Sequence, residues 1–486
     1  MVIDSFCTTN GKKFVHQELE RSQTRCSTAA FKILQHAVGA SKNLEQDTKA
    51  IEMAARKVST GDEEAEPFIE QEEEEKLHKG MGWKRAAFTM MAEIVGTGVL
   101  GLSHAAAKVG GGLALIFLVS FGLASLFSSL LLAAVRREHP KVDSFQACAD
   151  LLGGERARRL TALCINTSWL FVLPYYLMAS AHALSVAFWW TDTCYATWAL
   201  LSVVLIGVPA QVRTFEGISS LSALSVASVA IALLVIGVEL IRGGQTQTDA
   251  TWSKPESSSV WDCFDAISST TFAYQGQSML LEIAHEMENA PRDFGKAITA
   301  SCGGLLALYS IATGLGYYYR GARVAGFLPD DLEDNASKTL VGLMLYFHVA
   351  VTYLVNNQPL SKKLYELRWG ASSTNVKLRW FGITMLLLAW SFVVANAIPW
   401  FSAFQALMGS LLGAPIMFLF PVAFYVLDPR QAANVKHLPT RFALATTGGV
   451  ILPLTLGVGS VAAFVGLSEA WGDGAAFACV PGGYDG

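Results

Sequence analysis

The sequence predicts an all-α polytopic membrane protein of about eleven transmembrane helices, two of them discontinuous. Of its 486 residues, 52% are hydrophobic and only 16% are charged, whereas soluble domains carry about 25% charged residues. Apolar stretches of roughly 20 residues, the length that a spanning helix needs, recur from residue 84 to residue 466. Glycines interrupt two of these stretches near their centres, which is the third observation.

The chain divides into three parts by composition. Residues 1–82 are polar and include an acidic run from Glu63 to Glu75, so we expect a disordered or regulatory cytoplasmic tail. The membrane domain is expected at 83–467, and a short extracytoplasmic segment at 468–486. No apolar stretch precedes residue 84, so the first span rather than a cleavable leader is expected to direct insertion. The net charge of −4 does not favour nucleic acid as a partner.

The expected spans follow one another closely, with tight hairpins at 110–112 and 398–399. A cytoplasmic N-terminus places most loop lysines and arginines inside, as the positive-inside rule requires. The fourth span is short and its ends are the least defined. The approximate limits are 84–109, 111–135, 160–188, 196–212, 217–241, 262–287, 296–319, 338–358, 378–397, 399–427 and 441–467.

The outer loops predicted in this way contain a glycosylation sequon and three cysteines. Asn335 begins the sequon Asn-Ala-Ser. Cys194, Cys263 and Cys479 would lie where disulfides form. Cys194 with Cys263 is the preferred pair, because both flank outer ends of spans; free, buried thiols are the alternative.

The first interrupted span carries Gly96-Thr97-Gly98 at its centre. An unpaired backbone group costs several kcal/mol in hydrocarbon, so such a break persists only where its N–H and C=O groups find other partners. We expect the N–H groups of Thr97, Gly98, Val99 and Leu100 to begin an outer half-helix. A helix N-terminus carries partial positive charge and free donors, which suits a carboxylate.

The second interrupted span carries Phe272-Ala273-Tyr274, followed by Gly276. The carbonyl groups of residues 272–274 are expected to end a half-helix whose partial negative charge suits an ammonium group. The two breaks are the first members of two sets of five spans, the arrangement of an inverted repeat with one shared site. Together they predict binding of a free, zwitterionic α-amino acid. The alternative is that the small residues serve only close helix packing.

Two titratable side chains and one hydroxyl at membrane depth are candidates for ion coupling. Glu93 lies three residues before the first break, and an intramembrane carboxyl group is a functional candidate by default. His348 can titrate and Thr352, one turn later, can offer an oxygen to a cation. Structural roles for Glu93 and His348 remain open. The sequence contains no Walker motif, HExxH or nucleophile elbow, so neither an enzyme nor a metal site is expected.

These residues resemble the amino acid/auxin permease family over about residues 80–467. The resemblance is carried by Ala92 to Leu102, by Phe272-Ala273-Tyr274 with Leu281-Glu282-Ile283, and by His348-Val349 with Gln358-Pro359. It implies a LeuT-like fold of eleven helices, alternating access and secondary active transport of amino acids. Related sodium-coupled members carry an asparagine just before the glycines, where this chain has Ala92, and a fungal branch has a glutamate near the position of Glu93.

The sequence therefore predicts a proton-coupled symporter of neutral amino acids that needs no cofactor beyond its coupling ion. A sodium-coupled carrier or a vacuolar or lysosomal transporter of the same fold is the nearest alternative, so the membrane stays open between the plasma membrane and an organelle. An amino acid sensor that signals through a partner of the N-terminal tail is the alternative from another class.

Overall fold

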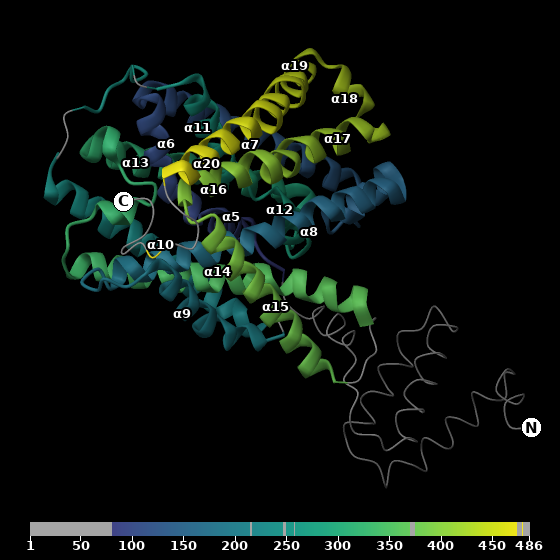
Figure 1. Ribbon diagram of the computed structural model, residues 1–486. Helices are drawn as coiled ribbons and strands as arrows, with labels where there is room; N and C mark the ends of the chain where they lie inside the picture. Colours follow the sequence, from purple (N-terminus) through teal and green to yellow (C-terminus); the bar gives the residue numbers. More distant parts are fainter. Residues whose placement is uncertain are drawn as a thin grey trace, which may run out of the picture. The chain divides into compact units, whose positions relative to one another are not determined.

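The computed structural model describes residues 80–213, 216–245, 249–256, 258–369, 375–473 and 479, and these residues are almost entirely helical (Figure 1). The predicted all-α membrane fold is confirmed. The tail predicted at 1–82 lies outside the described residues, apart from 80–82. Of the segment predicted at 468–486, residues 468–473 continue the last helix, and only residue 479 is described beyond them.

The first predicted span is bent by 53° at its glycines. The helix α5 ends at Ile94, and the chain resumes helical geometry at Thr97. The long helix α8 is kinked at Gly154, whose φ of 69° favours glycine, so it consists of two helical segments that meet at that residue. This part of the chain contains α5 (Trp83–Ile94), η2 (Thr97–Gly101), α6 (Leu102–Val109), α7 (Gly111–Glu138), α8 (Phe145–Ala187), α9 (Tyr195–Gly207) and α10 (Glu216–Gly243).

The second discontinuous span follows α10. A capping box of Ser259 and Asp262 begins α11, and the chain leaves helical geometry between Ala273 and Gln277. The later helices contain prolines and π-helical turns, which bend a helix without ending it. This part contains α11 (Val260–Ala273), α12 (Gln277–His285), α13 (Ala290–Arg320), α14 (Ala336–Trp369), α15 (Val376–Ala397), α16 (Phe401–Leu407), α17 (Phe420–Leu427), α18 (Ala432–Lys436), α19 (Leu438–Thr446) and α20 (Ser460–Asp473).

Fewer described helices are long and apolar enough to span a membrane than the eleven spans that the sequence predicts. Within the described ranges, eight helices are long and apolar enough to cross a membrane, and the bent pair α5–α6 makes nine. The two other predicted spans coincide with α9, which has 13 residues, and with the interrupted pair α11 and α12. A total of eleven and the inverted repeat stay predictions.

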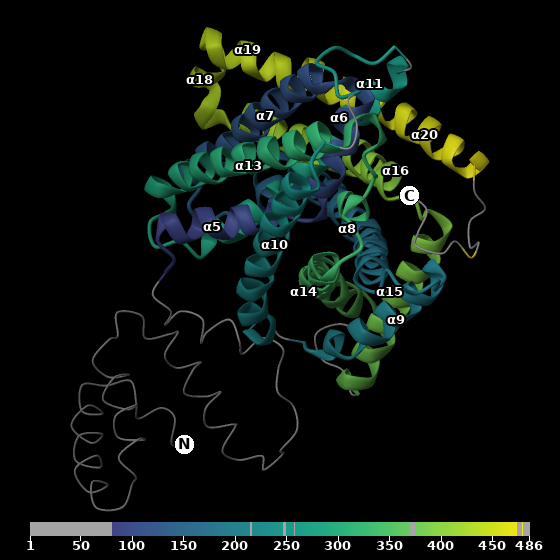
Figure 2. The same ribbon diagram turned by 90° about the vertical axis from the view of Figure 1, so that its left-hand side faces the viewer.

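Helix α14 packs against α8, α10 and α15, and Figure 2 shows it nearly end-on among them. Close approach depends on small residues, as is usual in membrane helices. A Cβ atom on Gly342 of α14 would lie only 2.7 Å from the carbonyl oxygen of Ala183 in α8. The helices around the breaks pack in two further groups: α13 packs against α7 and α5, and α11 packs against α6, α16 and α20.

The disulfide differs from the predicted pair. Cys194 is bonded to Cys479, with Cα atoms 4.9 Å apart, a separation typical of disulfides. Cys263 is a free thiol; it lies in the first turn of α11, where its sulfur lies 4.0 Å from the carbonyl oxygen of the N-cap residue Ser259. Sequence proximity to a span end could not distinguish these partners.

Asn335, the predicted glycosylation site, caps α14. Its side-chain oxygen accepts hydrogen bonds from the backbone N–H groups of Ser337 and Lys338, and its nitrogen donates to Glu239 at 3.2 Å. The side chain is half-buried. Its glycosylation stays a prediction.

Candidate functional site

The first break lies where the glycine pattern predicts it. Val95 and Gly96 have extended backbone geometry between the end of α5 and the start of η2. Thr97 and Gly98 are thus the first residues of a half-helix that continues through α6 to Val109. The first N–H groups of a helix have no partner within it. The Thr97 hydroxyl is buried and has no hydrogen-bond partner among the described residues.

The second break lies against the first. A Cβ atom on Gly98 would lie 3.0 Å from the Cα atom of Ala273, the last residue of α11. A Cβ atom on Gly276 would overlap the side chain of Ile94, the last residue of α5. Both glycines are therefore required by the close approach of the two broken helices rather than by an unusual φ angle.

A cavity of about 70 Å³ lies beside the two breaks. This volume accommodates several waters or a small solute. Seven of the residues singled out from the sequence line it: Glu93, Gly96, Thr97, Gly98, Phe272, Ala273 and Gly276. The structure adds polar groups that sequence reasoning did not select: Ser168 and Tyr176 of α8, Gln275, Ser278 of α12 and Asn356 of α14.

Other predicted residues lie away from this cavity. The side chains of Val99 and Leu100 are fully buried in the hydrophobic core, so only their backbone N–H groups can serve a ligand. Tyr274 is also buried, and its carbonyl oxygen accepts a long hydrogen bond of 3.4 Å from Ser125.

The candidate coupling residues of α14 are separated from Glu93. The imidazole Nδ1 of His348 lies 2.9 Å from the hydroxyl oxygen of Ser225 in α10. The hydroxyl of Thr352 donates to the His348 carbonyl oxygen of its own helix at 2.9 Å. Neither side chain is among the described residues that line the cavity, whereas Glu93 is.

Two side chains that the sequence analysis missed hold the broken backbones. The Tyr309 hydroxyl of α13 lies 2.8 Å from the carbonyl oxygen of Ala273 and 3.2 Å from that of Ile94. The Gln405 amide of α16 donates to the carbonyl oxygens of Gly98, at 3.1 Å, and Ser269, at 3.3 Å. A glutamine in an apolar helix was a usable signal, but a tyrosine is too common in such helices to stand out.

A layer of rings connects the cavity wall to one end of the bundle, the α13–α14 end, which carries the loop between α13 and α14. Phe272 contacts Tyr175 at a centroid distance of 4.8 Å, Tyr175 contacts Phe401 at 5.1 Å, and Phe401 contacts Phe327 of that loop at 5.1 Å. These rings are largely buried. Aromatic side chains are therefore in continuous contact from the cavity wall to this loop.

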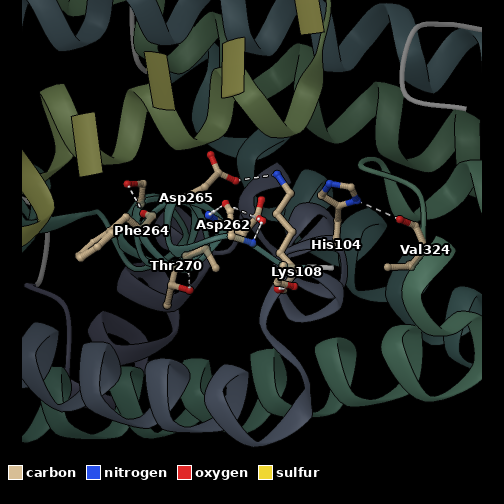
Figure 3. A network of polar contacts seen from close by, with 11 residues as sticks. His104, Lys108, Asp262, Phe264, Asp265, Thr270 and Val324 are labelled. Atoms are coloured by element: carbon tan, nitrogen blue, oxygen red, sulfur yellow. Dashed lines mark hydrogen bonds and ion pairs between the residues drawn. The ribbon is translucent and has the colours of Figure 1, made fainter. Parts of the chain in front are cut away.

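An ion pair joins the two half-helices at the α13–α14 end (Figure 3). Lys108 of α6 donates to Asp265 of α11 at 2.7 Å, and the Asp265 side chain is only 8% exposed. The nearby imidazole of His104 lies 2.9 Å from the Val324 carbonyl oxygen in the loop after α13. The half-helices α6 and α11 are thus held to each other by charge as well as by packing.

The site offers donors, acceptors and one carboxyl group in a small volume. Among the described lining residues, Glu93 is the only one with an ordinarily charged side chain. Across the described part of the chain, no three His, Cys, Asp or Glu residues are grouped so that they could hold a metal ion. The arrangement can bind a small polar solute through backbone groups and exchange a proton through Glu93.

Comparison with known proteins covers most of the chain. Residues 79–446 match the family model described as transmembrane amino acid transporter protein. The N amino acid transport system protein of Neurospora crassa is 25% identical over 441 residues, which span 85% of this chain and 90% of that protein. From Arabidopsis thaliana, amino acid transporter ANT1 is 26% identical over 71% of this chain and 84% of its own length, and amino acid permease 8 is 22% identical over 80% and 91%.

Proposed function

Because the chain belongs to the transmembrane amino acid transporter family, we propose that it is a secondary transporter that carries neutral amino acids together with protons. The cavity at the two breaks is the observation that carries this proposal, since it brings backbone donors, backbone acceptors and one carboxyl group together. A carrier of this kind alternates its access between the two sides of the membrane.

The substrate carboxylate is assigned to the first break. The N–H groups of residues 97–100 begin the half-helix and carry partial positive charge. The Thr97 hydroxyl adds a candidate donor, because Thr97 lines the cavity and its buried hydroxyl lacks a partner among the described residues. A short ligand can approach this backbone closely because Gly96 and Gly98 carry no side chain.

The substrate ammonium group is assigned to the carbonyl oxygens of the second break. Those of Phe272 and Ala273 belong to residues that line the cavity. Tyr309 already donates to the Ala273 oxygen, and the backbone N–H of Gln275 donates to the Phe272 oxygen at 3.1 Å. A carbonyl oxygen has two lone pairs, so the Ala273 oxygen can accept a second donor, whereas the Phe272 oxygen also accepts from the Tyr274 N–H. No lysine or arginine is among the described lining residues, which favours a neutral side chain.

The coupled proton is assigned to Glu93, with His348 as the second candidate. Glu93 lines the cavity, so its proton can be exchanged beside the bound substrate. A sodium-coupled carrier is the alternative, and in it Thr352 would offer its hydroxyl oxygen to the ion. The position of Glu93 favours the proton. The membrane in which the carrier works is either the plasma membrane or that of a vacuole or lysosome.

Uptake of labelled neutral amino acids into proteoliposomes tests the proposal. We expect an imposed pH gradient to drive accumulation, while replacing sodium by choline has no effect. Glu93→Gln should abolish uphill accumulation and retain exchange, because substrate binding does not require the carboxylate. Glu282→Gln is the matched control, since Glu282 is a half-buried carboxyl of α12 outside the cavity lining. Uphill uptake by Glu93→Gln equal to that of the original chain would contradict the assignment.

The sensor alternative assigns signalling to the N-terminal tail, and the described part of the chain begins next to α12. The Met81 N–H donates to the Glu286 carbonyl oxygen at 2.7 Å, and the Glu288 N–H donates to the Met81 oxygen at 3.2 Å. Met81, which belongs to the same compact unit as the membrane helices, is therefore paired with the chain where α12 ends. A sensor would show amino acid binding with negligible flux. Deletion of residues 1–75 without loss of uptake would argue against it.

A further inference from the structure

The carbonyl ends of two half-helices converge at one point beside the cavity. Helix α5 ends at Ile94 and helix α11 ends at Ala273, and the last carbonyl groups of a helix carry partial negative charge. In transporters with broken helices, unwound carbonyls and the C-terminal ends of half-helices coordinate the coupling cation. The chemistry at this point is thus that of a cation site.

A side chain of the protein already occupies this point. The hydroxyl of Tyr309 lies 2.8 Å from the Ala273 oxygen and 3.2 Å from the Ile94 oxygen. One hydroxyl has one proton, so it donates chiefly to Ala273 and is shared with Ile94. The Tyr309 side chain is fully buried, and water therefore does not replace it.

The surrounding packing holds the hydroxyl in place. The ring of Tyr309 makes an edge contact with that of Tyr274, at a centroid distance of 5.1 Å. The close approach of Gly98 to Ala273 and of Gly276 to Ile94 fixes the two helix ends on either side of the oxygen. Tyr309 is not among the described residues that line the cavity, so it acts on the site through the backbone of the breaks.

We propose that the hydroxyl of Tyr309 takes the place of a coupling sodium ion between the carbonyl oxygens of Ile94 and Ala273, and so makes the carrier independent of sodium. The proton of the phenol satisfies the partial negative charge that a cation would otherwise neutralise. Tyr309 is a positioning and ion-selectivity residue in this account. The expected effect on uptake rests on the proposed transport function. The position of the Tyr309 hydroxyl between the two carbonyl oxygens does not depend on that function.

The test replaces the hydroxyl and measures the response to sodium. Tyr309→Phe removes only the donor, and Tyr309→Ser also opens space for an ion. We expect the thermal midpoint of both purified variants to rise in sodium chloride relative to choline chloride at equal ionic strength, by about 1–2 °C when sodium is near ten times its Kd. The original chain should show no difference. In proteoliposomes, sodium should restore part of the uptake that Tyr309→Phe loses.

Tyr353→Phe is the matched control. Tyr353 is also fully buried, and its hydroxyl pairs with that of Ser391 at 3.2 Å, away from the helix breaks. The thermal midpoint of this variant should be the same in sodium chloride as in choline chloride. A merely structural role of Tyr309 predicts a loss of stability that sodium does not restore.

The outcomes separate this inference from the proposed function. Absence of a sodium response in both Tyr309 variants would overturn it, as would a sodium response of the original chain that Tyr309→Phe removes. Suppose that a pH gradient does not drive uptake by the original chain, while sodium raises the thermal midpoints of the Tyr309 variants. That result would contradict proton coupling and would support the present inference.

Discussion

Replacing Gln405 by leucine tests how the broken helices are held. The glutamine is fully buried. Its amide nitrogen donates to the carbonyl oxygens of Gly98, at 3.1 Å, and Ser269, at 3.3 Å, and its oxygen accepts from the Tyr175 hydroxyl at 3.2 Å. Leucine is similar in size and fills the space, but it leaves all three of these groups without that partner.

The expected cost follows from the loss of those three hydrogen bonds. An unpaired buried polar group costs about 1–3 kcal/mol, but side-chain hydrogen bonds inside membrane proteins measure about 0.6 kcal/mol on average and about 1.7 at most. We therefore expect Gln405→Leu to lower the free energy of unfolding by about 1–3 kcal/mol. Because Gly98 belongs to the cavity wall, the displaced backbone should also raise the KM for uptake.

Equilibrium unfolding in mixed micelles and uptake into proteoliposomes measure the two effects. Gln211→Leu is the control, since Gln211 donates to the Gly207 carbonyl oxygen at 3.0 Å, distant in sequence from both breaks. It should lose stability without a change in KM. A Gln405→Leu protein with unaltered KM and a stability within about 0.5 kcal/mol of the original, the range of neutral surface changes, would refute the reasoning.

Two further predictions concern the α13–α14 end. Lys108→Met should impair uptake more than the double change with Asp265→Asn, because the single change leaves an uncompensated buried carboxylate, which typically costs about 3–5 kcal/mol; equal impairment would argue against the ion pair. In the non-reduced protein Cys263 should react with maleimide, while Cys194 and Cys479 should react only after reduction. Mass spectrometry of the labelled peptides would identify which thiols reacted, and labelling of Cys479 before reduction would contradict the observed disulfide.

The helix breaks were predictable because their causes are local. Glycine is unfavourable in a helix interior, and apolar flanks place Gly96 and Gly98 at membrane depth. The same reasoning identified Glu93, since a carboxyl group inside an apolar span is conspicuous wherever the chain folds. The structure brings these residues together at one cavity.

Partners distant in sequence were beyond such reasoning. His348 and Thr352 share the apolar span that suggested them, but Asn356, one turn beyond Thr352 along α14, is the residue of this helix that lines the cavity. Cys194 had two possible partners in the loops predicted to lie outside, and only the path of the chain selected Cys479.

By itself, the sequence determined the helical membrane fold, the family to which the chain belongs and the two places where helices break. Hydropathy and glycine content act over a few residues, so they can be evaluated before the chain folds. Only the tertiary structure decided what satisfies the freed backbone groups. Tyr309 lies 36 residues from Ala273, and Gln405 lies 307 residues from Gly98. A hydrogen bond forms only within about 3 Å, and helix packing alone brings such distant groups so close.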